Sequence, residues 1–450
     1  MIINTKNLIL KRFNKSLVNY NYFNWFNDHD VQQYIKFKPK DLEDLKKSVD
    51  KIIKTKNSYF FAIFYKSTHI GNIRIHNINL NTNEAWFGIL IGEKKFRNRG
   101  YAKEVILSLQ NWLIRQGIYF LKLGVEKKNQ HALKLYQKCN FYIYQKKQQH
   151  YVMLNKLFLS KFILGTAQFR SKYGVTNFKR KNMKLSEKNK ILNYLSTKSS
   201  INELDTASNY KLYKRDLGSL KKTFYLNTKI LTTEKISYLK LKNFLIKCKI
   251  KDNAIINTLF IHDGDNVLTD DGLKLLNKIN KLKKEKRILK IGLSIHKFEN
   301  LLKIINTVPF DVIQIPYNFI DRRADAYFKK LKDKKIEIQV RSIFLQGTLL
   351  TKVSTNKKLS LIFDKFNKIS QNKHINRLRY TLSFILKNKY IDKVIIGIRN
   401  LKEFRQINNI NFFYNSINAL NKLKSNDQMI INPLEWKELV LDEKKPIKSI

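Results

Sequence analysis

From residue 161 onward, short apolar runs alternate with lysine-rich helical patterns such as DDGLKLLNKINKLKKEK. Apolar runs of this length are typical of buried strands. Eight runs are present, and they read FILGTAQ, INELDTA, FYLNTKI, NTLFIH, LKIGLSI, DVIQIPYN, IEIQVRSI and DKVIIGI. Eight strands that alternate with helices over about 250 residues predict a closed parallel (β/α)8 barrel, a TIM barrel, within residues 161–450. An open doubly wound sheet is the alternative, but no GxGxxG follows the first run, which favours the barrel.

Residues 1–157 mix strands and helices in a less regular order. Helices are predicted near LVNYNYFNWF, from Asp41 to Lys54, and at KEVILSLQNWLIRQ and HALKLYQKC. Strands are predicted at LILKRF, YFFAIFY, HIGNIRIHNI, AWFGILIG, FLKLGV, FYIYQKK and HYVMLNK. This order predicts an α+β domain over residues 1–157, followed by the barrel, so that the chain as a whole is of the α/β class.

The chain is strongly basic, with 88 Lys and Arg against 35 Asp and Glu and a net charge of +53. Such a balance is typical of proteins that bind nucleic acid or an anionic membrane surface. Here the lysines are spread over the whole chain together with abundant Asn and Ile, which indicates drift toward AT-rich codons rather than a binding stripe. We therefore expect small-molecule substrates, with neither nucleic acid nor a membrane as partner. A basic nucleic-acid-binding scaffold with vestigial sites is the alternative, and the oligomeric state stays open.

The sequence contains no motif for targeting or for metal binding. No apolar run approaches the ~18 residues that span a bilayer, and the N-terminal residues lack the apolar stretch and cleavage site of a signal peptide. We therefore expect a cytoplasmic protein. Cys139 and Cys248 lie in helical patterns without a CxxC spacing or a histidine pair. This predicts neither a disulfide nor a metal site, and both thiols are expected to be buried and reduced.

Polar residues with complementary chemistry stand at the ends of three consecutive strand-like runs. They are Asp205 and Tyr210 in NELDTASNY, Lys229 in FYLNTKI and His262 in NTLFIHD. Reduction of a carbonyl by hydride needs a proton donor and stabilisation of the developing oxyanion. Tyr210 can donate the proton if Lys229 lowers its pKa, while Asp205 holds the lysine and His262 orients the carbonyl. Taken singly, each residue also fits a structural role, as an ion pair, a helix cap or a core histidine.

The motifs DTASNY, NTKI and FIHD resemble those of the aldo/keto reductases, and the resemblance covers residues 161 to about 440. It implies that Tyr210 is the acid/base and that Asp205, Lys229 and His262 complete a catalytic tetrad. It also implies NADPH or NADH as cofactor. The residues implied at the cofactor are Ser294 and Gln314 at the carboxamide, Ser342 along the pyrophosphate, and Gly397 and Arg399 at the adenosine phosphate.

Several positions depart from the pattern of that family. Ile295 stands where Asn is common, and Arg341 takes the place of an aromatic residue that stacks on the cofactor. Glu403 stands where Arg or Gln often helps to hold a 2′-phosphate. A carboxylate at this position would repel the phosphate, so the choice between NADPH and NADH stays open.

A basic turn with one glycine separates the strand AWFGILIG from the helix that follows it. The turn reads Arg97, Asn98, Arg99, Gly100, Tyr101 and Ala102. Successive backbone N–H groups at a helix N-terminus hold a pyrophosphate well, because the helix dipole also favours negative charge there. The spacing RxxGxA alone is a weak signal, since it is frequent in solvated basic turns.

The segments FRNRGYAKE and NQHALKLYQKCNF resemble the GNAT acetyltransferases, over nearly all of residues 5–155. The resemblance implies acetyl-CoA as acyl donor. The residues implied at the donor are Arg97, Arg99, Gly100 and Ala102 at the pyrophosphate, and Ile89, Ile91 and Asn129 along the pantetheine. It further implies that Tyr136 protonates the leaving CoA thiolate, although a core aromatic is the alternative for Tyr136. Glu84 is a candidate general base, and proton loss through water is the alternative.

Together these patterns predict a bifunctional enzyme. We expect N-acetylation of a small amine, such as a nucleotide-linked amino sugar, and reduction of a sugar-like carbonyl. The acetyltransferase half resembles a branch that acts in nonulosonic acid synthesis, and the opening GTAQFRSKYGVTN resembles a reductase branch associated with surface-polysaccharide gene clusters. Acetylation of a protein N-terminus is the rival within the same fold.

Overall fold

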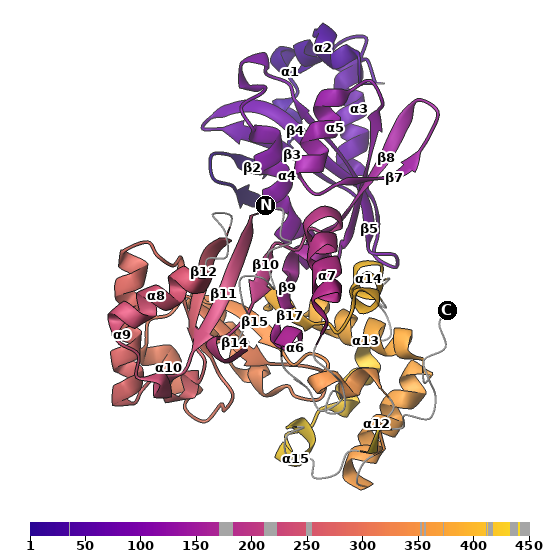
Figure 1. The fold of residues 1–450 in the computed structure, drawn as a ribbon. Helices are drawn as coiled ribbons and strands as arrows, with labels where there is room; N and C mark the ends of the chain where they lie inside the picture. Colours follow the sequence, from indigo (N-terminus) through magenta and orange to yellow (C-terminus); the bar gives the residue numbers. More distant parts are fainter. Residues whose placement is uncertain are drawn as a thin grey trace. The chain divides into compact units, whose positions relative to one another are not determined.

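The computed structural model describes residues 1–35, 37–170, 183–210, 223–248, 254–351, 353–354, 357–371, 373–410, 412, 417–432 and 440–441. The chain divides into two compact units, Met1–Phe158 and Leu159–Ile450 (Figure 1). The first is a mixed α+β unit and the second is a closed barrel, so the predicted fold class is confirmed.

The first unit is built on one eight-stranded sheet with the order β1-β2-β3-β4-β5-β6-β8-β7. Every neighbouring pair is antiparallel except β5 and β6, which are parallel. The strands are β1 (Ile2–Asn4), β2 (Ile9–Arg12), β3 (Tyr59–Tyr65), β4 (Thr68–Asn79), β5 (Glu84–Ile91), β6 (Phe120–Glu126), β7 (Tyr142–Lys146) and β8 (His150–Lys156). The parallel pair requires a crossover, which is made by the helix between β5 and β6.

Helices cover the two faces of this sheet. The helices α1 (Tyr20–Asn24), α2 (His29–Gln32) and α3 (Leu42–Lys54) belong to one face, and α4 (Tyr101–Arg115) and α5 (Gln130–Lys138) belong to the other. Phe60, Ala62 and Phe64 of β3 pack with Leu45 of α3 in one core cluster. Because side chains alternate along a strand, the intervening Phe61 points the other way, where its ring meets Trp112 of α4. We call these two sides the α1–α3 face and the α4–α5 face.

The barrel of the second unit closes in the order β10-β11-β12-β13-β14-β15-β17-β9. All neighbouring strands are parallel, and the last pair joins Gly397 to Gly165. The strands are β9 (Phe162–Gly165), β10 (Glu203–Asp205), β11 (Phe224–Ile230), β12 (Ala254–Ile261), β13 (Lys290–Ser294), β14 (Val312–Pro316), β15 (Glu337–Arg341) and β17 (Lys393–Gly397). All carboxyl ends therefore meet at one rim, where the chemistry of such barrels is placed.

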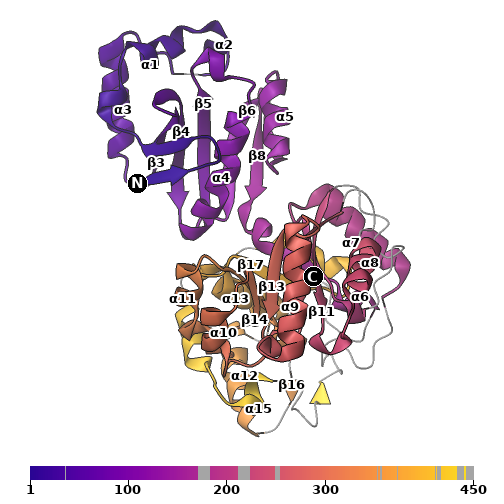
Figure 2. The same ribbon diagram turned by 90° about the vertical axis from the view of Figure 1, so that its left-hand side faces the viewer.

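Helices surround the barrel, and Figure 2 shows α7, α8, α9, α10 and α11 around β11, β13, β14 and β17. They are α6 (Ala167–Arg170), α7 (Leu185–Lys198), α8 (Tyr238–Cys248), α9 (Asp270–Lys284), α10 (Leu301–Thr307), α11 (Phe328–Asp333), α12 (Lys357–Ser370), α13 (His374–Lys387), α14 (Leu401–Asn408) and α15 (Gln428–Ile431). A further antiparallel pair joins β16 (Val353–Ser354) to β18 (Val440–Leu441). The interior is tightly filled, since a Cβ added to Gly292 would lie 2.3 Å from the Phe260 ring.

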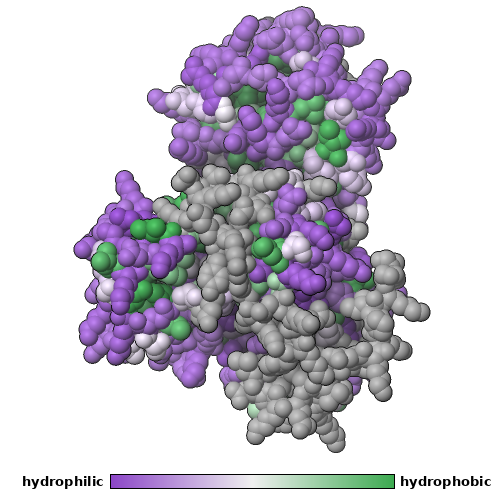
Figure 3. Space-filling model, in the orientation of Figure 1, coloured by the Kyte–Doolittle hydropathy of each residue, from purple (hydrophilic) through white to green (hydrophobic). Residues whose placement is uncertain are grey.

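The described surface has the hydrophilic character that the composition predicts. The described residues facing the viewer in Figure 3 are mostly hydrophilic, with scattered apolar side chains. Within the described ranges, no helix has the length and apolar character needed to cross a membrane.

Both cysteines are free thiols, but only Cys139 is buried. Cys248 is partly exposed, because it lies in the last turn of α8, so the expectation that both thiols are buried is wrong for this residue.

Candidate active sites

A buried ion pair lies at the rim of the barrel. The ammonium of Lys229 on β11 donates to a carboxylate oxygen of Asp205, the last residue of β10. The same ammonium donates to the carbonyl of Thr206 at 3.2 Å, and the amide of Gln314 donates to the other Asp205 oxygen at 3.0 Å. Both charges are buried, so each depends on the other for compensation. Burial lowers the pKa of Lys229, although the neighbouring Asp205 opposes this shift.

Tyr210 and His262 stand beside this pair. Tyr210 ends a short 3-10 turn, Ser208–Tyr210, and the centroid of its ring lies 6.0 Å from the Lys229 ammonium. The rings of Tyr210 and His262 are 6.4 Å apart between centroids and nearly perpendicular, at 86°. The structure thus brings the four residues predicted at the strand ends into one site.

The imidazole of His262 is neutral over the ordinary pH range. Burial, and then the positive charges of Lys229 and Arg341, lower its pKa to about 4. Its Nδ1 atom is buried and has no hydrogen-bond partner among the described residues. A neutral imidazole with an unused polar atom is suited to hydrogen bonding a substrate oxygen.

Ser294 and Gln314 lie side by side at the ends of β13 and β14, where they are register partners. The Ser294 hydroxyl is buried, and no group in the described part of the chain hydrogen bonds with it. An unsatisfied buried hydroxyl is costly, and here it adjoins an amide side chain. This pair fits a ligand that presents both a donor and an acceptor, such as a nicotinamide carboxamide.

Arg341 and His296 form a contact at the rim that the sequence did not predict. The guanidinium of Arg341 donates to the carbonyl of Ile295 at 3.0 Å and lies 3.0 Å from Nδ1 of His296. Burial, and then Arg341, lower the pKa of His296 to about 3. His296 lies within the run GLSIHKF, two positions after Ser294, and this short distance from a strand end could have indicated it. Arg341 stood out in the sequence only as a replacement for an aromatic residue.

The loop after β15 and the end of β17 complete the rim. Ser342, Leu345 and Gln346 all have left-handed backbones, with φ of 55°, 46° and 54°. Such conformations are rare for residues other than glycine and concentrate at ligand-binding loops. Gly397 ends β17, and a Cβ there would lie 2.9 Å from the side-chain oxygen of Gln168.

Arg399 is already held by a carboxylate. Its Nε donates to Glu403 at 2.6 Å, and its backbone N–H donates to the other oxygen of the same carboxylate at 2.7 Å. Glu403 lies in the first turn of α14, so its carboxylate occupies the helix end that would otherwise attract a phosphate.

In the first unit, the parallel strands β5 and β6 separate along their length. They pair only at Glu84 with Phe120, Ala85 with Leu121 and Trp86 with Lys122, although they extend to Ile91 and Glu126. Beyond Trp86 each strand stays paired on its outer edge, with β4 and β8 respectively. The inner edges of residues 87–91 and 123–126 therefore face a gap. Backbone groups there need partners, and an extended molecule with amide groups supplies them.

The turn after β5 presents backbone N–H groups at the start of α4. Asn98 and Gly100 have left-handed backbones, with φ of 60° and 81°, and a Cβ at Gly100 would meet no atom within 4 Å. Within the described ranges, no acceptor meets the N–H groups from Asn98 through Lys103. The turn can therefore receive an anion such as a pyrophosphate.

Arg97 differs from the other residues predicted at this turn because its backbone N–H and its guanidinium already bind other groups of the protein. Its N–H donates to the carbonyl of Lys94 at 3.1 Å. Its guanidinium donates to the carbonyls of Ile91 at 3.0 Å and Gly92 at 2.6 Å, and pairs with Asp28 at 2.8 Å. Arg97 thus holds the loop in place, and the open N–H groups begin at Asn98.

The remaining predicted residues lie on α5 and at the base of β5. Tyr136 packs edge-on against Phe87 of β5, with 5.8 Å between ring centroids, and burial raises its pKa to about 12. Asn129 caps α5 by accepting from the N–H of Ala132 at 3.0 Å. Glu84 forms an ion pair with Lys122 at 2.8 Å, so the carboxylate considered as a general base already has a partner.

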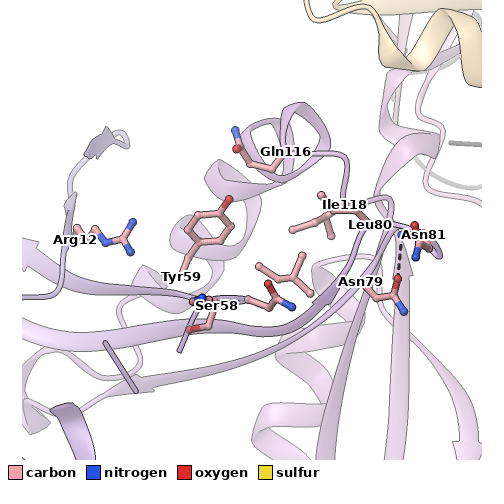
Figure 4. A pocket seen from close by; sticks show the side chains of 11 residues that line it. Arg12, Ser58, Tyr59, Asn79, Leu80, Asn81, Gln116 and Ile118 are labelled. Atoms are coloured by element: carbon pink, nitrogen blue, oxygen red, sulfur yellow. Dashed lines mark hydrogen bonds between the residues drawn. The ribbon is translucent and has the colours of Figure 1, made fainter. Parts of the chain in front are cut away.

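A second hollow of about 590 Å³ lies at the opposite end of α4 from the open N–H groups. Figure 4 shows Arg12, Tyr59, Asn79 and Gln116 around it. Among the described residues, its lining contains the cations Arg12 and Lys56 and no carboxylate. None of the residues predicted to bind a cofactor lines this pocket.

The two sites define a chain that joins an acyltransferase fold to a barrel oxidoreductase. Residues 161–425 match the aldo/keto reductase family, and the chain belongs to that family. Residues 7–142 match the acetyltransferase (GNAT) domain. Both predicted resemblances are thereby confirmed, and both domains are enzyme domains.

Relatives of the first domain have been found among characterised proteins. Acetyltransferase PseH of Campylobacter jejuni subsp. jejuni serotype O:23/36 (strain 81-176) is 29% identical over 134 residues, which are 29% of this chain and 80% of that protein. The spermidine N-acetyltransferase from Vibrio cholerae in complex with CoA and spermine is 18% identical, with a TM-score of 0.31, over 34% of this chain and 98% of that one. The ribosomal L7/L12 alpha-N-protein acetyltransferase RimL in complex with coenzyme A is 17% identical, with a TM-score of 0.31, over 34% and 96%.

Proposed function

We propose that this chain is a bifunctional enzyme. Its first domain transfers the acetyl group of acetyl-CoA to a small amine such as a nucleotide-linked amino sugar. Its barrel reduces a sugar-like carbonyl with a nicotinamide cofactor, in the synthesis of surface polysaccharide or nonulosonic acid. The similarity to acetyltransferase PseH supports an amino-sugar acceptor. For the reductase, the observation that carries the proposal is the buried Asp205–Lys229 pair beside Tyr210 and His262.

For the reduction we assign the following roles. NADH or NADPH supplies the hydride when bound, with its carboxamide at Ser294 and Gln314, its pyrophosphate along Ser342, and its adenosine end near Gly397 and Arg399. Nδ1 of His262, buried without a protein partner, carries the proton of the neutral ring and donates it as a hydrogen bond to the substrate oxygen. The Tyr210 hydroxyl gives that oxygen its proton as the hydride reaches the carbonyl carbon. The Lys229 ammonium stabilises the tyrosinate that remains, and Asp205 keeps the ammonium in place.

For the acetyl transfer, the donor lies in the gap between β5 and β6. Its pyrophosphate meets the N–H groups of Asn98 through Ala102, including Arg99 and Gly100, and its pantetheine follows the backbone of Ile89 and Ile91 with Asn129 nearby. The amine attacks the thioester carbon, and the CoA sulfur leaves with the bonding pair. Tyr136 donates its proton to that sulfur. Because Glu84 is paired with Lys122, the amine proton leaves through water.

The proposal is tested by calorimetric titration of the intact protein with acetyl-CoA, NADH and NADPH. Moderate salt suppresses nonspecific binding of these anions to a chain of net charge +53. We expect one acetyl-CoA and one nicotinamide cofactor to bind per chain. Absence of binding by acetyl-CoA and by both nicotinamides, together with a salt-sensitive shift on DNA, would instead support a basic scaffold.

Replacing Glu403 by glutamine is expected to strengthen NADPH binding roughly tenfold, with little change for NADH. The carboxylate now neutralises Arg399 and occupies the helix end, so it competes with a 2′-phosphate for both partners. Wild type is therefore expected to prefer NADH. The measurement is the ratio of the two dissociation constants in each protein. Glu285→Gln, at the exposed end of α9, is the matched control. An unchanged ratio in Glu403→Gln would assign the cofactor choice to other residues.

A further inference from the structure

The gap between β5 and β6 opens onto a strip of the α1–α3 face. Register partners share a face of the sheet, so Trp86 and Lys122 point to the same side, together with Gly88 and Gly124 two positions further along. A Cβ at Gly88 would meet no atom within 4 Å, and one at Gly124 would meet only the ring of His150, at 4.0 Å. The two glycines therefore leave an open slot where the strands part.

Arg74 stands next to this slot. It is the register partner of Gly88 in β5 and of Phe60 in β3, and Phe60 belongs to the core under α1–α3. The side chain of Arg74 thus lies on the α1–α3 face, between that core and the slot. Its Nε atom is buried without a partner, and no ion pair or hydrogen bond links the guanidinium to any described residue. The side chain is half-buried. A buried polar atom without a partner is costly, so Nε together with the partly exposed guanidinium fits a group from outside the chain.

The other charges on this strip are already compensated. Glu84 pairs with Lys122 at 2.8 Å, and Glu126 pairs with Lys128 at 3.5 Å. His76, the register partner of Trp86, adds no charge near neutral pH because burial and then Arg74 lower its pKa. The one uncompensated charge among these groups is therefore positive. An amine that carries several positive charges finds no available carboxylate among them.

We propose that Arg74 binds an anionic group of the acetyl acceptor, so that the acceptor is an amine attached to a phosphate or a carboxylate. This proposal rests on the acetyltransferase activity proposed above. The planar guanidinium forms two parallel hydrogen bonds with either group. These two bonds hold the amine in the slot between Gly88 and Gly124. The same positive charge repels a polyamine.

The test is a titration of the whole protein after saturation with CoA and NADH, so that both cofactor sites are filled. The probes are glucosamine 1-phosphate, glucosaminic acid, glucosamine and spermidine. We expect one of the two anionic probes to bind, and comparison of the two distinguishes a phosphate from a carboxylate. Arg74→Gln is expected to weaken that binding by about tenfold or more, whereas Arg74→Lys retains part of it.

Two further readouts show whether Arg74 acts by contacting the anion or by supporting the fold. Arg12→Gln, in the pocket at the far end of α4, is the matched control and should leave the binding unchanged. Arg74→Gln should not lower the melting temperature, because it removes a half-buried charge that has no partner among the described residues. Equal binding by wild type and Arg74→Gln, loss in Arg12→Gln instead, or binding of spermidine alone would each overturn the proposal. Failure of CoA itself to bind would instead count against the acetyltransferase activity.

Discussion

The Tyr210→Phe variant is expected to lose carbonyl reduction by roughly 10³-fold in kcat/KM, while keeping its cofactors. The substitution removes only the hydroxyl, so the perpendicular contact of the ring with His262 is retained. The Asp205–Lys229 pair is also left intact. Without the hydroxyl, the oxygen that develops negative charge keeps the hydrogen bond from His262 but loses the group that transfers a proton to it. The loss is measured as cofactor oxidation, followed by absorbance, with a sugar-like carbonyl that wild type reduces.

Two measurements show whether the loss is chemical or structural. Nicotinamide binding and acetyl-CoA binding by Tyr210→Phe should match wild type, because neither cofactor is assigned to the hydroxyl. Tyr238→Phe is the matched control, since its hydroxyl donates to Glu285 on the surface, at 2.7 Å. Reductase turnover within about threefold of wild type in Tyr210→Phe would remove Tyr210 from its assigned role.

The barrel and its rim could be predicted because strand ends carry positional meaning. Each apolar run fixed a strand, and parallel strands place their carboxyl ends together, so Asp205, Lys229 and His262 had to meet. The contact between Arg341 and His296 could not be predicted in the same way. It depends on side-chain direction at two strands that are not neighbours, β13 and β15, and no sequence spacing encodes that.

The same limit applies to the first domain. The turn before α4 could be predicted from its glycine and from its place between a strand and a helix. The binding of the Arg97 guanidinium to other groups of the protein could not be predicted. That binding depends on Asp28, which is remote in sequence. Arg74 gave no signal as one arginine among 88 Lys and Arg. Its position opposite Gly88 follows only from the strand register, which a one-residue slip would reverse.

The Tyr136→Phe variant is expected to lose about 10²-fold in kcat of acetyl transfer, with an unchanged dissociation constant for acetyl-CoA. Burial raises the pKa of Tyr136 to about 12, so the hydroxyl keeps its proton at neutral pH and has it available for the leaving thiolate. A group with a raised pKa acts in its protonated form up to that pKa. Wild-type kcat should therefore show no loss from this residue as the pH rises to about 9. The rate is measured as release of free CoA thiol.

The packing of Tyr136 decides how this result is interpreted. Its ring contacts Phe87, and phenylalanine keeps that contact, so a fall in kcat without a fall in melting temperature points to the lost proton donor. Tyr144→Phe, on the exposed strand β7, is the matched control and should leave kcat unchanged. A kcat of Tyr136→Phe within about threefold of wild type would make the residue a core aromatic of α5. The thiolate would then leave unprotonated or take its proton from water.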